Sequence, residues 1–129
     1  GGEKSGHLLF TELSPTGDGL LSAITVLGLV ARAGTPVGAM ADAVPLDPQL
    51  QRAVQVPPGG GERLLMEPDL QSAIREAEVA LAQTGGRVLV RLSGTEPLLR
   101  VMGEGPDRAA VTAAVERLIE VAASLVRGR

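Results

Sequence analysis

The spacing of apolar residues changes along the chain and divides its first third into a strand and a helix. From Leu20 to about Ala33 the apolar positions recur with helical spacing, and Gly34 is a natural end for this helix. Thr16 or Asp18 is expected to cap its first turn, because a short side-chain oxygen can accept hydrogen bonds from the free amides there. The preceding residues 7–10, HLLF, are expected to form the end of a short strand.

Beyond residue 48 the pattern indicates three strands. Leu50 to Val56 alternate apolar with polar residues, as in a strand with one buried face. Residues 87–92, RVLVRL, and 98–104, LLRVMGE, predict two further strands. The five residues between them, SGTEP, are typical of a tight loop.

Two helices are predicted around these strands. Asp69 is expected to cap the first, which ends before Gly85, and the turn Gly105-Pro106-Asp107 is expected to start the second. The run PPGGGE at residues 57–62 is expected to be a mobile loop. The predicted core positions are Leu70, Ala73, Ile74, Ala77 and Leu81 in the first helix, and Val111, Val115, Leu118, Ala122 and Leu125 in the second.

The order strand, helix, strand, strand, helix predicts an α+β domain. Two helices packed on one face of a small, mostly antiparallel sheet bury these apolar faces economically. The two prolines between Val44 and Pro48 indicate a boundary. We therefore expect residues 1–42 to be a partial domain, a strand–helix remnant, and residues 43–129 to be a complete one.

Composition excludes several classes of function. The 129 residues contain no cysteine and one histidine, His7, which excludes thiolate chemistry and multi-histidine metal sites. Phe10 is the only aromatic residue and the net charge is -3, so neither base stacking nor a general attraction for nucleic acid is expected. No apolar run reaches the ~20 residues of a membrane span. We expect a cytoplasmic protein with no nucleic-acid or membrane partner.

The strongest candidate site is the loop between the last two predicted strands. Arg91 precedes it, Ser93, Gly94 and Thr95 lie within it, and Arg100 follows. Backbone amides in such a turn favour anions, a guanidinium binds phosphate through two parallel hydrogen bonds, and the hydroxyls can donate. Alternatively, glycine and proline are only the turn residues of a hairpin with two solvated arginines. Local chemistry leaves both interpretations open.

A second candidate site lies at the beginning of the chain. Glu3 and Ser5 can hydrogen-bond the vicinal hydroxyls of a polyol, and His7 can transfer a proton or contact a phosphate near neutral pH. The alternative is a loose terminus followed by a strand. Asp18 by itself is a poor magnesium or calcium site, so we interpret it as a helix cap.

Three segments, GGEKSGHLLF, TGDGLLSAI and RLSGTEPLLRVMGEG, occur in this order and resemble the alpha-D-phosphohexomutases. The similarity runs from Gly1 to about Asp107, and the terminal helix also fits. Members of that family have four domains around one cleft, which implies that this chain is the end of the third domain followed by the fourth. The similarity is greatest to members that act on glucosamine phosphates, with those acting on mannose and glucose phosphates as the alternative.

The resemblance implies roles for the candidate residues. Glu3 and Ser5 would contact sugar hydroxyls, and His7 would lie beside the reacting phosphate. Four residues would bind the phosphate that is not reacting, namely Arg91, Ser93, Gly94 and Thr95. Glu96 and Arg100 belong to the same motif, which implies proximity to this phosphate for both, and Arg100 is assigned to phosphate binding on that ground. Two residues depart from the family pattern: Lys4 replaces a usual Gln, and Gly103 replaces a usual Val and should soften its strand.

The resemblance further implies a phosphosugar substrate, a phosphoserine, a bisphosphorylated sugar intermediate and Mg²⁺ in the full-length enzyme. The chain contains neither a Ser-His-Asn-Pro segment nor an Asp-Gly-Asp-Gly-Asp-Arg segment, so no metal ligand is assigned within it. It also opens without an initiator methionine. We therefore expect a fragment that is inactive alone and that needs the missing N-terminal domains of the same protein. A non-catalytic phosphosugar-binding module is the rival interpretation.

Overall fold

The computed structural model describes residues 1–2, 6–44 and 46–128 and divides into two compact units. The first unit is Gly1–Pro45 and the second is Leu46–Arg129. The division falls within the proline segment Val44–Pro48.

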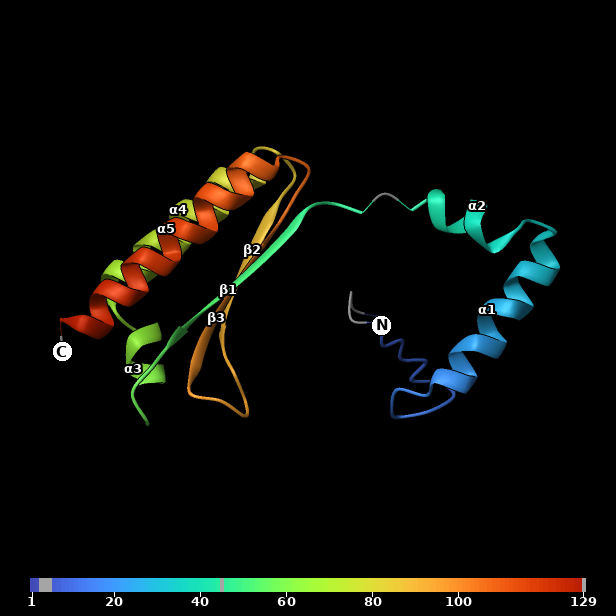
Figure 1. The fold of residues 1–129 in the computed structure, drawn as a ribbon, viewed down its shortest axis with the longest axis horizontal. Coiled ribbons are helices and arrows are strands. Elements are labelled where there is room, and N and C mark those ends of the chain that lie inside the picture. Colours follow the sequence, from blue (N-terminus) through green and yellow to red (C-terminus); the bar gives the residue numbers. More distant parts are fainter. Residues whose placement is uncertain (3–5, 45, 129) are drawn as a thin grey trace. The chain divides into compact units, whose positions relative to one another are not determined.

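The helix α1 (Gly19–Ala33) begins and ends where the sequence indicates (Figure 1). The Asp18 carboxylate accepts hydrogen bonds from the amides of Leu20 and Leu21, at 2.9 and 3.0 Å, so Asp18 is the cap. Gly34 ends the helix with a φ of 63°, a conformation that glycine adopts without steric cost. A short helix, α2 (Val37–Asp42), follows.

The predicted strand at His7–Phe10 is wrong. Within the described residues this segment forms one isolated bridge, between Gly2 and Leu8, and the Leu9 amide donates to the Gly1 carbonyl at 2.7 Å. A strand is defined by its paired neighbour, and the described part of this unit offers only Gly1 and Gly2 for pairing.

The apolar side of α1 is exposed. Leu20, Ile24 and Leu27 expose 72, 61 and 66% of their surfaces, and no residue of α1 is buried. A helix with this pattern normally buries its apolar stripe against a sheet or another helix. The described residues of this unit do not provide that surface.

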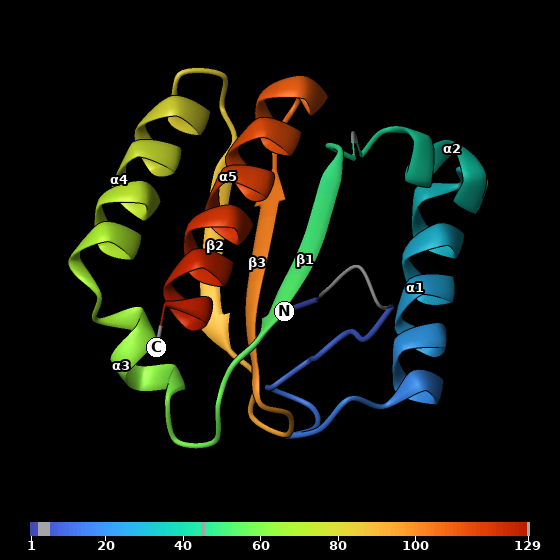
Figure 2. The same ribbon diagram turned by 60° about the vertical axis from the view of Figure 1, so that its left-hand side comes forward.

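The second unit has the predicted α+β fold. Its antiparallel sheet has the strand order β1-β3-β2, and Figures 1 and 2 show two long helices side by side on one face of that sheet. The elements are β1 (Gln49–Gln55), α3 (Gly61–Leu65), α4 (Pro68–Ala82), β2 (Arg87–Leu92), β3 (Leu98–Glu104) and α5 (Arg108–Arg127). Period-two strands and amphipathic helices thus bury their apolar sides in one shared core.

The core lies between the sheet and the two long helices. Alternate strand residues face the helices, so Leu99 and Val101 of β3 are fully buried. The other buried positions are mostly those predicted: Leu70, Ala73, Ala77 and Leu81 in α4, and Val111, Val115, Leu118 and Ala122 in α5. Ile74 and Leu125 are half-buried and pack against this cluster.

Two predictions before α4 are wrong. Glu67, rather than Asp69, stands at the cap position, and Pro68 is the first residue of the helix. Proline suits that position because its missing amide hydrogen would have no partner there. The predicted loop at 57–62 ends at Gly60, because α3 begins at Gly61, and both glycines are buried.

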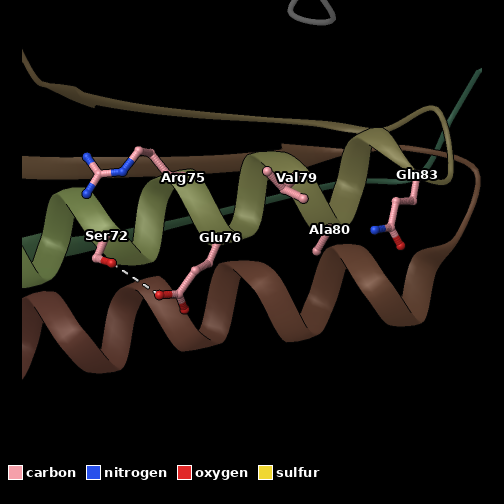
Figure 3. Close-up of a pocket in the computed structure, with 6 residues that line it drawn as sticks. All are labelled: Ser72, Arg75, Glu76, Val79, Ala80 and Gln83. Carbon is pink, nitrogen blue, oxygen red and sulfur yellow. Dashed lines mark hydrogen bonds between the residues drawn. The ribbon is translucent and has the colours of Figure 1, made fainter.

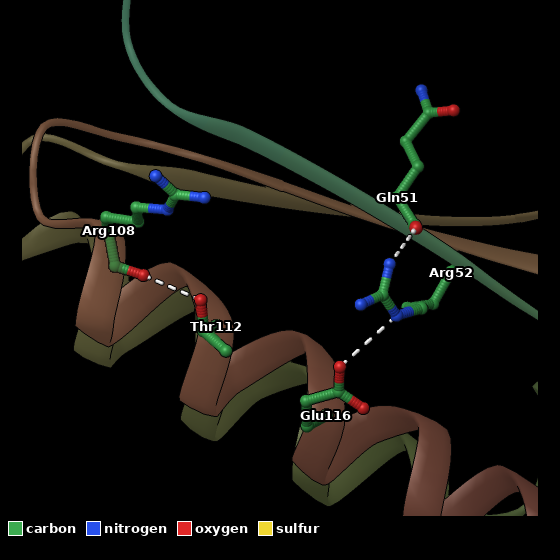
Figure 4. Close-up of polar contacts among 5 residues, drawn as sticks. All are labelled: Gln51, Arg52, Arg108, Thr112 and Glu116. Carbon is green, nitrogen blue, oxygen red and sulfur yellow. Dashed lines mark hydrogen bonds and ion pairs between the residues drawn. The ribbon is translucent and has the colours of Figure 1, made fainter.

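An ion pair joins the edge strand β1 to α5 (Figure 4). The Arg52 Nε atom lies 3.2 Å from Glu116 Oε1, and its Nη1 donates to the Gln51 carbonyl. Because both side chains are about half exposed, a pair of this kind contributes about 0.2–1 kcal/mol. It therefore orients the edge strand more than it stabilises the fold.

Gly103 lies where α5 packs closely against β3. It is buried and pairs with Leu50 on one side and Val88 on the other. A Cβ atom added at Gly103 would be 2.7 Å from Val115 Cγ2 and 3.2 Å from Val111 Cγ1. Glycine thus allows the helix to pack directly on the strand.

We predict that Gly103→Ala lowers the free energy of unfolding by about 1–3 kcal/mol, the usual cost of an overpacked core. This cost has to exceed the ~0.4–1 kcal/mol that glycine-to-alanine changes gain through the unfolded state. Urea denaturation of the chain measures the difference. Gly128→Ala is the control, since the nearest atom to its added Cβ is the Ser124 carbonyl oxygen at 3.5 Å. Equal stabilities of the two variants would contradict the packing role of Gly103.

Candidate functional site

The loop Ser93–Pro97 is fixed at both ends by backbone hydrogen bonds. The Ser93 amide donates to the Leu98 carbonyl at 2.9 Å, and the Leu98 amide donates to the Glu96 carbonyl at 2.8 Å. The Val56 amide, just beyond β1, donates to the Pro97 carbonyl at 2.9 Å. All three strands therefore hold this loop in place.

The short helix α3 supports the loop from the core side. Leu92, the last residue of β2, packs against the core, and a Cβ atom at Gly61 would lie 2.7 Å from Leu92 Cδ2. The glycine run that the sequence indicated as a mobile loop thus includes a close contact with the residue before Ser93. No local sequence signal reveals this, because the contact joins residues far apart in the chain.

The structure brings the two predicted arginines together. Arg91 on β2 pairs directly with Arg100 on β3, and Ala53 on β1 flanks Arg100 on its other side. Because Leu92 and Leu99 face the core, both guanidinium groups leave the sheet on the face that the helices do not cover. Like charges placed directly opposite each other repel, so this pair favours an anion.

Glu96 forms an ion pair with one of these arginines. Its Oε2 atom lies 2.6 Å from Arg100 Nη2. Within the described residues the Arg91 side chain forms no ion pair or hydrogen bond. The sequence analysis placed Glu96 in the same motif as Arg100, but it did not indicate the contact between them.

The loop also presents polar groups that the fold does not use. Among the described residues, neither the Ser93 nor the Thr95 hydroxyl forms a hydrogen bond, and the amides of Gly94, Thr95 and Glu96 donate to no protein atom. Space is open beside Gly94, where an added Cβ would meet nothing within 4 Å. Amides, hydroxyls and a guanidinium around one exposed loop can bind a small oxyanion.

The candidate residues of the first unit are only partly described. Glu3, Lys4 and Ser5 lie outside the described residues. His7 is exposed, and its Cδ2 atom lies 3.8 Å from the position of a Cβ atom built on Gly17. The imidazole thus lies beside the turn that leads into α1.

A surface hollow on α4 does not form a second site (Figure 3). Its lining residues come from α4 and from Gln83, the residue that caps the end of this helix. The one hydrogen bond among them joins the Ser72 hydroxyl to Glu76 at 3.2 Å. The lining consists of Ser72, Arg75, Glu76, Val79, Ala80 and Gln83. None of the predicted site residues lies there.

Within the described residues, no three His, Cys, Asp or Glu side chains gather closely enough to hold a metal ion. In the described part of the chain, no helix combines the length and the apolar character that crossing a membrane requires.

Known protein families match both units in order. Residues 53–121 match the family described as the C-terminal domain of phosphoglucomutase/phosphomannomutase, and residues 1–46 match its alpha/beta/alpha domain III. The chain belongs to the phosphoglucomutase/phosphomannomutase family. This confirms the resemblance inferred from the sequence motifs.

Several similar curated proteins of this family are phosphoglucosamine mutases. The protein of Paramagnetospirillum magneticum is 42% identical over 120 residues, which is 93% of this chain and 26% of that protein. The protein of Azorhizobium caulinodans is 45% identical over 120 residues, again 93% and 26%. This family member thus spans about a quarter of the length of the curated relatives that it matches.

A solved structure has the same fold. The crystal structure of Aspergillus fumigatus N-acetylphosphoglucosamine mutase, in complex with GlcNAc-6P and magnesium, matches with a TM-score of 0.67. The two are 23% identical, and the match covers 86% of this chain and 22% of that chain. At this identity the likeness shows the fold alone, and it confirms the predicted phosphohexomutase architecture.

We predict that Gly61→Ala strains the base of the loop, because the added methyl group has to displace the Leu92 side chain. The variant should lose about 1–3 kcal/mol of unfolding free energy and shift the amide resonances of residues 93–96. Leu92→Val removes the δ carbon that the added methyl group would contact, and it serves as the second substitution in a double-mutant cycle. We expect the double variant to be more stable than the sum of the single losses by about 0.5–3 kcal/mol. Simple additivity would contradict direct contact between these two positions.

Proposed function

We propose that this chain is the C-terminal part of a phosphoglucosamine mutase, which interconverts glucosamine 6-phosphate and glucosamine 1-phosphate. The observation that carries the proposal is the cross-strand pair Arg91 and Arg100 beside a loop with unused amides and hydroxyls. The identity of 42 to 45% with phosphoglucosamine mutases over almost the whole chain supports this substrate class.

In this proposal the loop binds the phosphate that is not reacting. Moving a phosphate between two carbons of one sugar requires that the substrate be held first by one phosphate and then by the other. Arg91 binds two phosphate oxygens through its forked donors, while Ser93, Thr95 and the loop amides donate to the same group. Positioning supplies much of the catalysis of phosphoryl transfer, which is why a site remote from the reaction matters.

The first unit supplies the sugar contacts and His7 in this scheme. Glu3 and Ser5 bind sugar hydroxyls, and His7 assists proton movement at the reacting phosphate. The serine whose phosphoryl group is transferred to the sugar phosphate, giving the bisphosphorylated intermediate, lies outside this chain. We place the Mg²⁺ of the complete enzyme outside it as well, because the sequence contains no Asp-Gly-Asp-Gly-Asp-Arg segment. The chain alone is therefore inactive.

A second candidate is a phosphomannomutase/phosphoglucomutase. The matching family descriptions favour it, as does Lys4, which stands where the glucosamine members usually have Gln. Turnover of the complete protein on glucosamine, mannose and glucose phosphates distinguishes the two. A non-catalytic phosphosugar-binding module would turn over none of the three.

We predict that inorganic phosphate binds this 129-residue chain weakly at the loop, with a dissociation constant on the order of millimolar, or ~4 kcal/mol. NMR titration should move the amides of residues 93–96 ahead of all others. Arg91→Ala should abolish these shifts, and Arg91→Lys should restore them only in part, because an ammonium group cannot form the bidentate pair. Arg75→Ala, an equal charge change on the exposed side of α4, is the control. Largest shifts at Arg63 or at residues 59–61 would refute the assignment.

We predict that His7→Ala in the complete enzyme lowers turnover about 10²–10⁴-fold, the usual range for general acid–base assistance. Steady-state kinetics on glucosamine 6-phosphate measures the effect. Glu12→Gln, another exposed position in the same unit, should leave turnover unchanged. If His7→Ala retains full turnover, His7 has no part in the reaction.

A further inference from the structure

The anion site contains an acid that no binding role explains. Two guanidinium groups face each other across β2 and β3, with Cβ atoms about 4.5–5.5 Å apart for directly opposed residues. An anion site gains from this positive charge. Glu96 nevertheless projects its carboxylate to Arg100 from within the same loop, at 2.6 Å.

The neighbouring acid on this face cannot take over that role. Glu104 pairs with Arg87 at 3.2 Å and accepts a hydrogen bond from Gln49 at 2.9 Å. The side chains of Leu89 and Met102 form the row between that group and the arginine pair. Within the described residues, Glu96 is therefore the only carboxylate paired with either Arg91 or Arg100.

The ion pair between Glu96 and Arg100 can open while the backbone stays in place. The Glu96 carbonyl accepts a hydrogen bond from the Leu98 amide at 2.8 Å, which fixes the point from which the Glu96 side chain extends. The Arg100 and Glu96 side chains are 43 and 54% exposed, so water and ions reach both partners. An exposed pair of this kind is weak and exchanges readily with other anions.

We propose that Glu96 is an internal counter-ion of the phosphate site. It neutralises Arg100 while the loop is empty, and phosphate displaces its carboxylate on binding. The inference rests on the proposed function of the loop and gives Glu96 a role in the release of phosphate. A mutase has to release each phosphate from this loop so that the sugar can reverse its orientation, and a competing carboxylate keeps the affinity low enough for release.

The test compares phosphate binding by the wild-type chain and by Glu96→Gln at constant ionic strength. Removing the competitor should tighten phosphate binding about 3- to 10-fold, the range expected for one exposed ion pair together with its repulsion of the phosphate. Glu78→Gln is the matched control, because it changes the net charge equally on the exposed side of α4. It should tighten binding by less than twofold.

Displacement of the Glu96 carboxylate from Arg100 can be measured separately from affinity. The Arg100 Nε–H resonance should move in the same direction when phosphate saturates the wild-type chain and when Glu96 becomes Gln. In an Arg100→Gln background, the gain from Glu96→Gln should shrink, since no pair remains to be broken. A gain of equal size in both backgrounds would overturn the counter-ion mechanism and leave only long-range repulsion.

The outcomes separate the two proposals. If the wild-type chain binds phosphate at the loop but Glu96→Gln binds no tighter than Glu78→Gln, the counter-ion inference is wrong and the phosphate site stands. If neither the wild-type chain nor Glu96→Gln binds phosphate at residues 93–96, the proposed function of the loop fails, and the counter-ion role fails with it. Glu96→Ala repeats the comparison without an amide that could pair with Arg100.

Discussion

The antiparallel pairing of β2 with β3 is the constraint on which both the core and the candidate site depend. In this register Leu92 and Leu99 face the helices, while Arg91 and Arg100 meet on the opposite face. A slip of β2 by one residue would turn Arg91 toward the core and expose Leu92. The apolar core therefore fixes the register, and the register in turn brings the two charges together. The stability of the core and the proposed anion binding thus depend on the same alternation of side chains.

Close helix packing keeps that sheet in place and supports the loop. α5 approaches β3 closely because Gly103 has no side chain, and α3 reaches Leu92 because Gly61 has none. Protein interiors are densely packed, so a methyl group at either position requires neighbours to move. These two glycines act at opposite ends of the strands that carry the site. The position of the loop is thus set by contacts made well away from its own residues.

Local patterns in the sequence predicted most of the elements but not the contacts between distant segments. The alternation in β2 and β3 and the capping by Asp18 depend on nearby residues, and both predictions were confirmed. The prediction of a strand at His7–Phe10 was wrong, because a strand requires a paired neighbour and local periodicity does not show whether one is present. The sequence predicted a loop at Gly61, because its contact with Leu92 joins residues far apart in the chain and leaves no local signal. The motif indicated Arg91 and Arg100, but only the register showed that they face each other.

The charge of the whole chain and the charge of the site have opposite signs. With a net charge of -3 the chain has no general attraction for anions, so binding has to come from the geometry of one loop. Arg87 is already paired with Glu104, and Arg100 with Glu96, which leaves Arg91 as the uncompensated charge on this face among the described residues. A single forked donor with nearby amides and hydroxyls selects a compact oxyanion over an extended polyanion. Under the proposed function, the exposure of this loop to water would keep phosphate binding reversible, so that the site could both hold and release a phosphate.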